Sequence, residues 1–356
     1  MKMQHRMRTG LVAGLLAAVT LAGCSSGSSS DTKAGAVAKP GEKVTLRLGY
    51  LANITHAPAL VGLQKGIFAG KLGPDVTLQP SVFNAGPAEV EALFSGAIDA
   101  TYIGPNPAIN AYAKSNGQAV RIVSGATSGG AFLVVNPSVN SAADLKGKKV
   151  ASPQLGNTQD VALRSWLKGQ GLKTDTQGGG DVSIVPQDNA TALAAFESGA
   201  IAGAWEPEPW ATRMVQEGKG KILVDERTLW PAGQFVTTEL MVRTAFMKEH
   251  PDVVQRLLEG QVAATDFINA NPADAKAAAN QALQQATGKA LSQSVLDAAW
   301  PHMTFTDDPL AASLRKGADN AKAVGLLDPN TKLDNLFDLT LLNKALKADG
   351  KPQVHS

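Results

Sequence analysis

Short apolar runs alternate with segments of helical periodicity from Val44 to Val242. The runs of β-branched and aliphatic residues predict strands over 44–50, 76–82, 98–102, 120–124, 132–136, 148–152, 182–186, 201–205, 221–225 and 235–242. Between them the periodicity predicts helices over 58–67, 87–95, 107–115, 158–169, 190–198 and 207–217. Such alternation predicts an α/β fold with mostly parallel sheets flanked by helices. After Val242 we expect no further strand, only a helical C-terminal portion over 247–348 that is interrupted by prolines.

A repeat inside the chain indicates two lobes. The sequence ALFSGAIDA at 92–100 resembles AAFESGAIA at 194–202, about a hundred residues later. In both copies a helix ends at a glycine, a short strand ends on an aromatic residue, and a proline-rich turn opens the next helix. The alternative explanation is chance similarity between two stretches rich in alanine and glycine. As a true repeat, it predicts a lobe I over 43–138 plus 236–348 and a lobe II over 139–235.

The first 24 residues have the layout of an export signal. Lys2, Arg6 and Arg8 precede an apolar run over 11–21 that is too short to span a bilayer, and the run ends in LAGC with Cys24. This predicts a signal peptide over 1–23 and a lipid attached to the thiol of Cys24. The alternative is an ordinary secretory signal in which a cysteine falls there by chance. The polar stretch 24–42 predicts a flexible tether, so we expect a body held at the outer face of the cytoplasmic membrane or in the periplasm.

Charge and cysteine content exclude several classes of protein. The 356 residues carry 33 basic and 31 acidic side chains, and three basic but no acidic ones lie in the signal peptide, so the mature chain is close to −1. Without a basic field, nucleic-acid binding is not expected. The single cysteine excludes a disulfide framework and a thiolate-held metal cluster within one chain. The five histidines lack metal spacing and no Gly-x-Ser-x-Gly elbow is present, so we expect no metal, no cofactor and no enzymatic activity.

The loops that follow the predicted strands carry polar residues and glycines at the starts of helices. In open α/β sheets ligands bind outside the carboxyl ends of the strands, so these loops predict one cleft between the lobes. In lobe I the candidate ligand-binding residues are Asn53, Thr55, His56, Asn84, Gly86, Tyr102, Gly104 and Asn106. His56 also fits a purely structural role, as a capping or packing residue.

In lobe II the candidates are Gln154, Gly156, Asn157, Thr158, Trp205 and Glu206. The helix N-terminus at 157–159 binds an anion through backbone N–H groups without lysine or arginine. Trp205 is predicted to form an apolar wall against the ligand and Glu206 to meet an amine or hydroxyl. We expect Glu208 to be solvated and Trp210 to have a structural role.

Seven short motifs together resemble one known family. They are GY at 49–50, NITHAP at 53–58, FNAGP at 83–87, GAIDATYIG at 96–104, DLKGKKV at 144–150, PQLGNTQD at 153–160 and AWEPEPW at 204–210. The set is similar to the solute-binding lipoproteins of bacterial ABC importers, in the nitrate/sulfonate/taurine branch, and it covers nearly the whole mature chain.

The resemblance implies a two-lobed periplasmic-binding fold of type II. It further implies a monomer that closes on a small solute and delivers it to a permease with cytoplasmic ATPase subunits. Aliphatic sulfonate is the leading ligand class by resemblance, while His56 after Asn53 also resembles the branch that binds thiamine pyrimidine precursors, and nitrate stays open. A surface receptor that does not take part in transport is the remaining alternative. We expect the anionic head at Gly86, Gly104 and 156–158, and closure about crossovers near 136–140 and 234–238.

Overall fold

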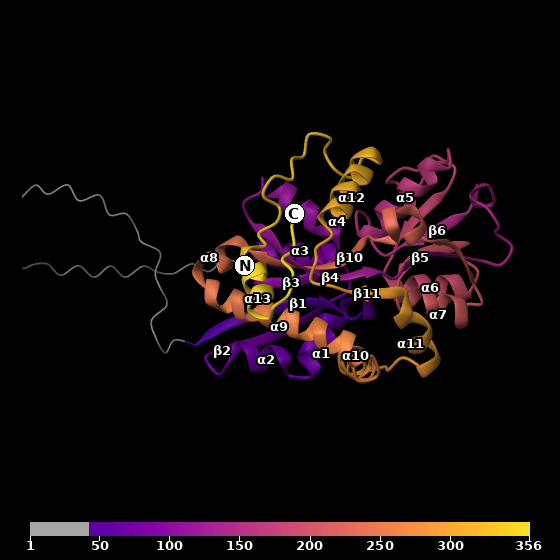
Figure 1. The fold of residues 1–356 in the computed structure, drawn as a ribbon. Coiled ribbons are helices and arrows are strands. Elements are labelled where there is room, and N and C mark those ends of the chain that lie inside the picture. Colours follow the sequence, from indigo (N-terminus) through magenta and orange to yellow (C-terminus); the bar gives the residue numbers. More distant parts are fainter. Residues whose placement is uncertain (1–42) are drawn as a thin grey trace, which may run out of the picture. The chain divides into compact units, whose positions relative to one another are not determined.

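The structure is a computed structural model that describes residues 43–356 (Figure 1). The predicted signal peptide over 1–23, the tether over 24–42 and the lipid site at Cys24 lie outside the described residues. From residue 43 onward, none of the helices combines the length and the apolar character that a membrane span requires.

The first sheet has six strands in the order β11-β4-β10-β3-β1-β2. They are β1 (Val44–Leu51), β2 (Val76–Phe83), β3 (Ala100–Ile103), β4 (Val120–Gly129), β10 (Val236–Arg243) and β11 (Met303–Phe305). Strand β1 runs parallel to β2 and β3, whereas β10 is antiparallel to β3 and β4, and β11 is antiparallel to β4.

The second sheet has five strands in the order β7-β6-β8-β5-β9. They are β5 (Ala131–Val135), β6 (Lys149–Ser152), β7 (Ser183–Pro186), β8 (Gly203–Pro207) and β9 (Lys221–Asp225). Strand β6 is parallel to β7 and β8, and β5 is antiparallel to both of its neighbours. The α/β fold with two sheets is confirmed, but both sheets are mixed rather than mostly parallel. In the second sheet β5 runs against the other four strands, and in the first sheet β10 and β11 run against the other four. Hydrophobic periodicity contains no information on strand direction.

The chain crosses from the first sheet to the second at Gly129 and Gly130, between β4 and β5. Both glycines have a positive φ, of 82° and 74°, which a residue with a side chain rarely adopts. Because β5 pairs with β8 and β9, residues 131–135 belong to the second sheet, whereas the sequence prediction assigned them to lobe I. The first crossover therefore precedes the predicted one near 136–140, where Asn136 already bonds to Ala202 of the second sheet. The chain returns at 226–235, immediately before β10, which overlaps the predicted 234–238.

Helices flank both sheets. They are α1 (Ala57–Gln64), α2 (Ile67–Leu72), α3 (Gly86–Phe94), α4 (Pro105–Lys114), α5 (Thr158–Gly169), α6 (Asn189–Glu197), α7 (Trp210–Gln216), α8 (Thr244–Glu249), α9 (Pro251–Ala270), α10 (Pro272–Thr287), α11 (Gln293–Ala299), α12 (Ala311–Ala323) and α13 (Thr340–Ala348). Short 3₁₀ turns are η1 (Ile54–His56), η2 (Ala142–Leu145), η3 (Glu226–Leu229), η4 (Pro231–Gly233) and η5 (Trp300–His302).

Most predicted helices are confirmed within a few residues, and α5 has the predicted bounds. The helix predicted over 58–67 ends at Gln64, and α2 follows from Ile67, because Gly66 has a left-handed φ of 67°. The helix predicted over 207–217 begins only at Trp210, since Pro207 ends β8. The prediction of no strand after Val242 was wrong: β11 forms from three residues, too few to show a periodicity.

Two apolar clusters cover the two faces of the first sheet, one under α1, α2, α9, α10 and α13 and the other under α3, α4 and α12. Phe68 of α2 is fully buried in the first cluster. A Cβ at Gly62 of α1 would lie 2.3 Å from the Phe68 ring, and one at Gly260 of α9 would lie 2.6 Å from it. Both glycines therefore let α1 and α9 approach the ring closely. The second sheet has one cluster towards α5 and another towards α6 and α7.

Candidate ligand-binding cleft

A cavity of about 30 Å³ lies between the loops of the two sheets. The first-sheet part contributes Leu51, Asn53, Thr55, His56, Asn84, Gly86, Gly104, Pro107 and Thr237, and the second-sheet part contributes Pro153, Asn157, Thr158, Gln159, Asn189 and Pro207. Nearly all of these residues lie at or just after the carboxyl ends of strands, so the structure has a cavity at the sheet edge for which the sequence predicted a cleft. One water needs about 10–15 Å³ on the same measure, so the cleft has room for only a few atoms.

Besides α1, whose N-cap residue is His56, four α-helices begin at this cavity. Gly86 is the first residue of α3, Gly104 caps α4, Asn157 caps α5, and Asn189 is the first residue of α6. A helix N-terminus has unpaired N–H groups and the positive end of the helix dipole. No charged side chain lines the cavity in the described part of the chain. The cleft therefore has a positive potential that comes from peptide dipoles alone, an arrangement that favours an anion.

The four helix starts do not contribute in the same way. Pro87 of α3 and Pro105 and Pro107 of α4 have no N–H, so these two helices act mainly through their dipoles. Helix α5 has no proline in its first turn. A Cβ added at Gly104 would lie 2.5 Å from the Thr158 hydroxyl oxygen, so the N-terminus of α4 meets that of α5 across the cleft.

His56 is a neutral hydrogen-bond donor in this cleft. Its side chain is 2% exposed, and its Nδ1 accepts a hydrogen bond from the Leu51 amide at 3.3 Å. An accepting Nδ1 carries no proton, so the ring hydrogen of the neutral form sits on Nε2. Burial lowers the pKa of His56 to about 3, which keeps the ring neutral at physiological pH.

The oxygens of three asparagine amides in the cleft are already engaged. Asn53 Oδ1 accepts from the Trp210 indole at 2.8 Å, and Asn157 Oδ1 accepts from the Gln159 amide at 2.9 Å. With its amide turned to match its neighbours, Asn189 accepts from Trp210 at 3.1 Å and donates to Glu206 at 3.1 Å. The buried Thr158 hydroxyl has no partner within residues 43–356. The side chains of the cleft thus present hydrogen-bond donors more than acceptors.

Eight of the fourteen candidate residues line the cavity, and six do not. Those that line it are Asn53, Thr55, His56, Asn84, Gly86, Gly104, Asn157 and Thr158, and those that do not are Tyr102, Asn106, Gln154, Gly156, Trp205 and Glu206. Gln154 is exposed, and the Gly156 amide donates to Asp160. Asn106 is buried and donates to the Gly317 carbonyl.

The two aromatic residues predicted to hold the ligand body are core residues instead. Trp205 is fully buried, donates to Glu226 at 2.7 Å and packs edge-on against Trp166. The Tyr102 hydroxyl donates to Gln261 inside the first sheet's core. Both side chains alternate onto a covered face of their strand, so the cavity is lined by residues at or beyond the strand ends, such as Pro207 and Gly104.

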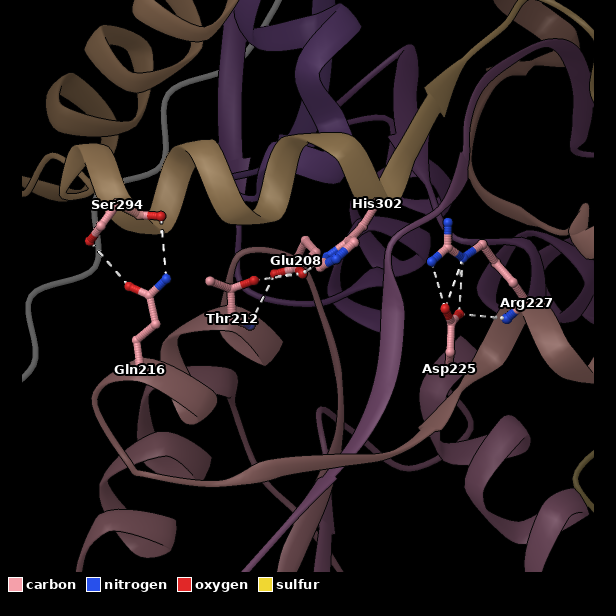
Figure 2. A network of polar contacts seen from close by, with 7 residues as sticks. All are labelled: Glu208, Thr212, Gln216, Asp225, Arg227, Ser294 and His302. Carbon is pink, nitrogen blue, oxygen red and sulfur yellow. Dashed lines mark hydrogen bonds and ion pairs between the residues drawn. The ribbon is translucent and has the colours of Figure 1, made fainter.

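Neither glutamate of the WEPEP segment is solvated. Burial raises the pKa of Glu206 well above its ordinary value, and one of its carboxyl oxygens has no partner in the described part of the chain. Glu208, expected in solvent, is fully buried: it accepts from the Thr212 amide and hydroxyl and pairs with His302 Nδ1 at 2.6 Å (Figure 2). Both side chains therefore point into the protein and not into solvent, and composition alone did not show this.

Six residues of the cavity were missed by the sequence analysis: Leu51, Pro107, Pro153, Asn189, Pro207 and Thr237. A seventh, Gln159, was predicted to contribute only its backbone N–H group. Asn189 had a usable signal, since it is a polar residue at a helix start directly after β7, the pattern that selected Asn157. Thr237 had none, because it enters from the start of the antiparallel strand β10. Within residues 43–356 no group of three or more histidine, cysteine, aspartate or glutamate side chains is placed to hold a metal ion.

Comparison with known proteins gives a consistent family assignment. The model of the NMT1-like family matches residues 39–283. A putative binding protein of Brucella abortus is 29% identical over 65% of this chain and 69% of its own length. The putative aliphatic sulfonates-binding protein of Bacillus subtilis is 25% identical over 96% of this chain and 98% of its own.

A solved structure gives the same fold. The alkanesulfonate-binding protein SsuA from Xanthomonas axonopodis pv. citri, bound to MOPS, has a TM-score of 0.67 and 22% identity over 85% of this chain and 98% of its own. The fold is therefore that of a periplasmic binding protein. Because the family model spans most of the described residues, the chain belongs to the NMT1-like family.

Proposed function

We propose that this protein is the extracytoplasmic solute-binding component of an ABC importer, and that it captures a small anionic organic solute, an aliphatic sulfonate or a taurine-like molecule. The observation that carries the proposal is the convergence of four helix N-termini on a cavity without charged side chains. Backbone dipoles and neutral donors suit a head group with one delocalised negative charge.

The relatives support the sulfonate class. The Bacillus subtilis protein that aligns over almost the full length of both chains is described as binding aliphatic sulfonates. A sulfonate has three equivalent oxygens, all acceptors, which match the donors of His56, Thr158 and the first turn of α5. The small cavity favours a short solute, since about 30 Å³ leaves little space beyond the head group.

Two lobes that close on the solute are part of the proposal. Sheet membership supports lobe boundaries at Gly129–Gly130 and near Gln234, in place of the predicted 138/139 and 235/236. The Trp210 indole of the second-sheet part bonds to Asn53 of the first-sheet part, a contact that separation of the lobes would break. We further propose export by residues 1–23, a lipid on Cys24, a tether over 24–42, a monomeric body, delivery to a permease with cytoplasmic ATPase subunits, and no enzymatic activity.

Ligand-induced thermal stabilisation tests the solute class. The panel comprises alkanesulfonates, taurine, nitrate and thiamine pyrimidine precursors. A ligand at about 100 times its Kd adds about 2.7 kcal/mol of stability, which gives a measurable rise in Tm. A rise with sulfonates supports the proposal, whereas a rise only with nitrate or pyrimidines moves the protein to those classes. Unchanged melting with every anion contradicts the anion site itself.

A further inference from the structure

Trp210 was expected to have only a structural role, yet its indole bonds to two residues that line the cavity. The residue is half-buried at the start of α7 and does not line the cavity. Its indole N–H donates to Asn53 Oδ1 at 2.8 Å, and Asn189 accepts from the same N–H at 3.1 Å. Asn53 and Asn189 both line the cavity, one from each sheet. One indole N–H therefore fixes the orientation of two amides on opposite sides of the cleft.

The amide orientation decides what Asn53 can offer a solute. A primary amide has an accepting oxygen and a donating nitrogen. The Trp210 contact turns the oxygen of Asn53 towards the indole, so the NH₂ group is the part of the amide that Trp210 leaves for the solute. His56 is restricted in the same sense, since its Nδ1 is occupied by the Leu51 amide and only Nε2–H is free. Asn53 and His56, which lie at the two ends of the first turn after β1, thus each present a hydrogen-bond donor to the solute.

The other polar groups of the cleft are less restricted. The Asn157 oxygen accepts from the Gln159 amide, which adds a third engaged acceptor. The Thr237 hydroxyl donates to the Gly129 carbonyl, so its oxygen can still accept, but it lies on β10 and not on the turn that holds Asn53 and His56. The Thr158 hydroxyl has no partner among the described residues and can also accept, but it lies on α5. A solute hydroxyl placed at the Asn53–His56 turn would meet donors from both of these residues.

We propose that Trp210 is a positioning residue that keeps Asn53 a donor, and that the cleft consequently selects fully deprotonated oxyanions over oxyanions of the same shape that carry a hydroxyl. This inference rests on the proposed function and narrows its solute class. Sulfonates meet the requirement, whereas a singly ionised phosphonate does not, because its P–OH would face a donor in a buried site. A buried donor left without an acceptor weakens binding by about 10-fold or more.

The test compares methanesulfonate with methylphosphonate by titration calorimetry, at a pH below neutral where the phosphonate keeps one hydroxyl. Wild-type protein is expected to bind methanesulfonate at least about 10-fold more tightly. Trp210→Phe removes the indole N–H but keeps an aromatic ring, so Asn53 can turn its oxygen to the solute. Affinity for both ligands falls, because a link between the two sheets is lost, and the ratio of the two affinities falls towards one.

Trp166→Phe is the matched control. Trp166 is a half-buried tryptophan of α5, and its indole N–H has no hydrogen-bond partner among the residues that the structure describes. This variant should keep the wild-type ratio. If the role of Trp210 were purely structural, Trp210→Phe would bind both ligands more weakly without a change in the ratio of the two affinities. An unchanged ratio in this variant therefore overturns the positioning role. Equal wild-type affinity for the two ligands overturns the selection.

A measurement without ligand separates this inference from the proposed function. Long-range ¹H–¹⁵N NMR spectra report which nitrogen of His56 carries the hydrogen. Nε2–H with an unprotonated, hydrogen-bonded Nδ1 supports the donor-only turn, and Nδ1–H overturns it whatever the protein binds. If the wild-type protein binds no oxyanion of the panel, the proposed function fails, and the proposed selection between oxyanions fails with it. In that case Nε2–H on His56 would still support the predicted hydrogen-bond geometry of the Asn53–His56 turn.

Discussion

Gly104→Ala tests whether the contact between α4 and α5 forms only when the cleft is closed. Gly104 has an ordinary φ of −73°, so alanine causes no backbone strain there. A Cβ would lie 2.5 Å from the Thr158 hydroxyl oxygen and 3.7 Å from the Thr237 carbonyl. Cβ atoms essentially never lie within 3.0 Å of another heavy atom, so the closed cleft must open slightly, push α5 away or turn the Thr158 hydroxyl out of its place.

The energy of this clash can be bounded. Overpacking by one methyl group in a close-packed contact costs about 1–3 kcal/mol. If the lobes separate without ligand, the cost falls only on the closed, ligand-bound state, and affinity drops by about 5- to 150-fold. The Tm of the ligand-free protein should stay close to that of the wild type. Calorimetric titration with the best ligand of the panel, together with thermal melts without ligand, measures both quantities.

Two other glycines provide controls. Gly169→Ala at the end of α5 places a methyl group in open space and should change neither affinity nor Tm by much. In Gly86→Ala the Cβ would lie 2.5 Å from Pro107, and both residues belong to the first-sheet part, so this variant should melt lower with or without ligand. A Gly104→Ala protein that melts as low as Gly86→Ala without ligand would refute the reasoning, since the α4–α5 contact would then be permanent.

Three further outcomes follow from buried groups. Burial raises the pKa of Glu226 to about 7, although the indoles of Trp205 and Trp230 donate to it. The folded protein therefore holds this proton more tightly than the unfolded chain does. The stability that the proton gives the folded state at acid pH is lost as the pH rises from about 4.5 to 7. Across that window the unfolding free energy of Glu226→Gln should rise relative to that of the wild type by up to about 3 kcal/mol. Urea unfolding at a series of pH values measures the difference between the two proteins, and a difference that does not change with pH would contradict the raised pKa. His302→Ala leaves the buried Glu208 with Thr212 alone and should lower the unfolding free energy by about 1–3 kcal/mol, whereas His355→Ala at the exposed C-terminus should be neutral. Phe68→Ala empties the space between Gly62 and Gly260 and should cost about 3–5 kcal/mol in the same assay, and a loss below about 1 kcal/mol would mean that α1 and α9 collapse into the gap.

The positions of the elements could be predicted from the sequence, and their connections only in part. Periodicity and proline at helix starts placed α5 and, within a few residues, the other helices up to α7 except α2, which was not predicted as a separate helix. The direction of β5 and β10 and the crossing at Gly129–Gly130 depend on which strands pair, and that is decided by contacts far apart in the chain. Strand β11 exists because residues 303–305 meet β4, so its own three residues contain too little information.

The candidate site shows the same limit. Residues directly after strands, such as Asn53, Asn84 and Asn157, were found because the strand end fixes their place. Trp205 and Tyr102 were misplaced since one residue along a strand changes the face, and both faces of these sheets are covered. The role of Trp210 was missed because its partner Asn53 lies 157 residues away in sequence, in the other sheet.

A site built from neutral donors has a physical advantage for a protein that must also release its solute. A lysine or arginine in a closed cleft would be a buried charge that needs a partner whenever the solute is absent. His56, the threonine hydroxyls and the helix N-termini need only hydrogen bonds, which water supplies when the cleft is open. The near balance of 33 basic and 31 acidic side chains is consistent with this arrangement, because the attraction for an anion comes from aligned peptide groups and needs no excess of basic residues. Affinity then depends on how completely the proposed closure removes water from those donors. If the contacts of Gly104 with Thr158 and of Trp210 with Asn53 form only on closing, they should control binding more strongly than net charge does.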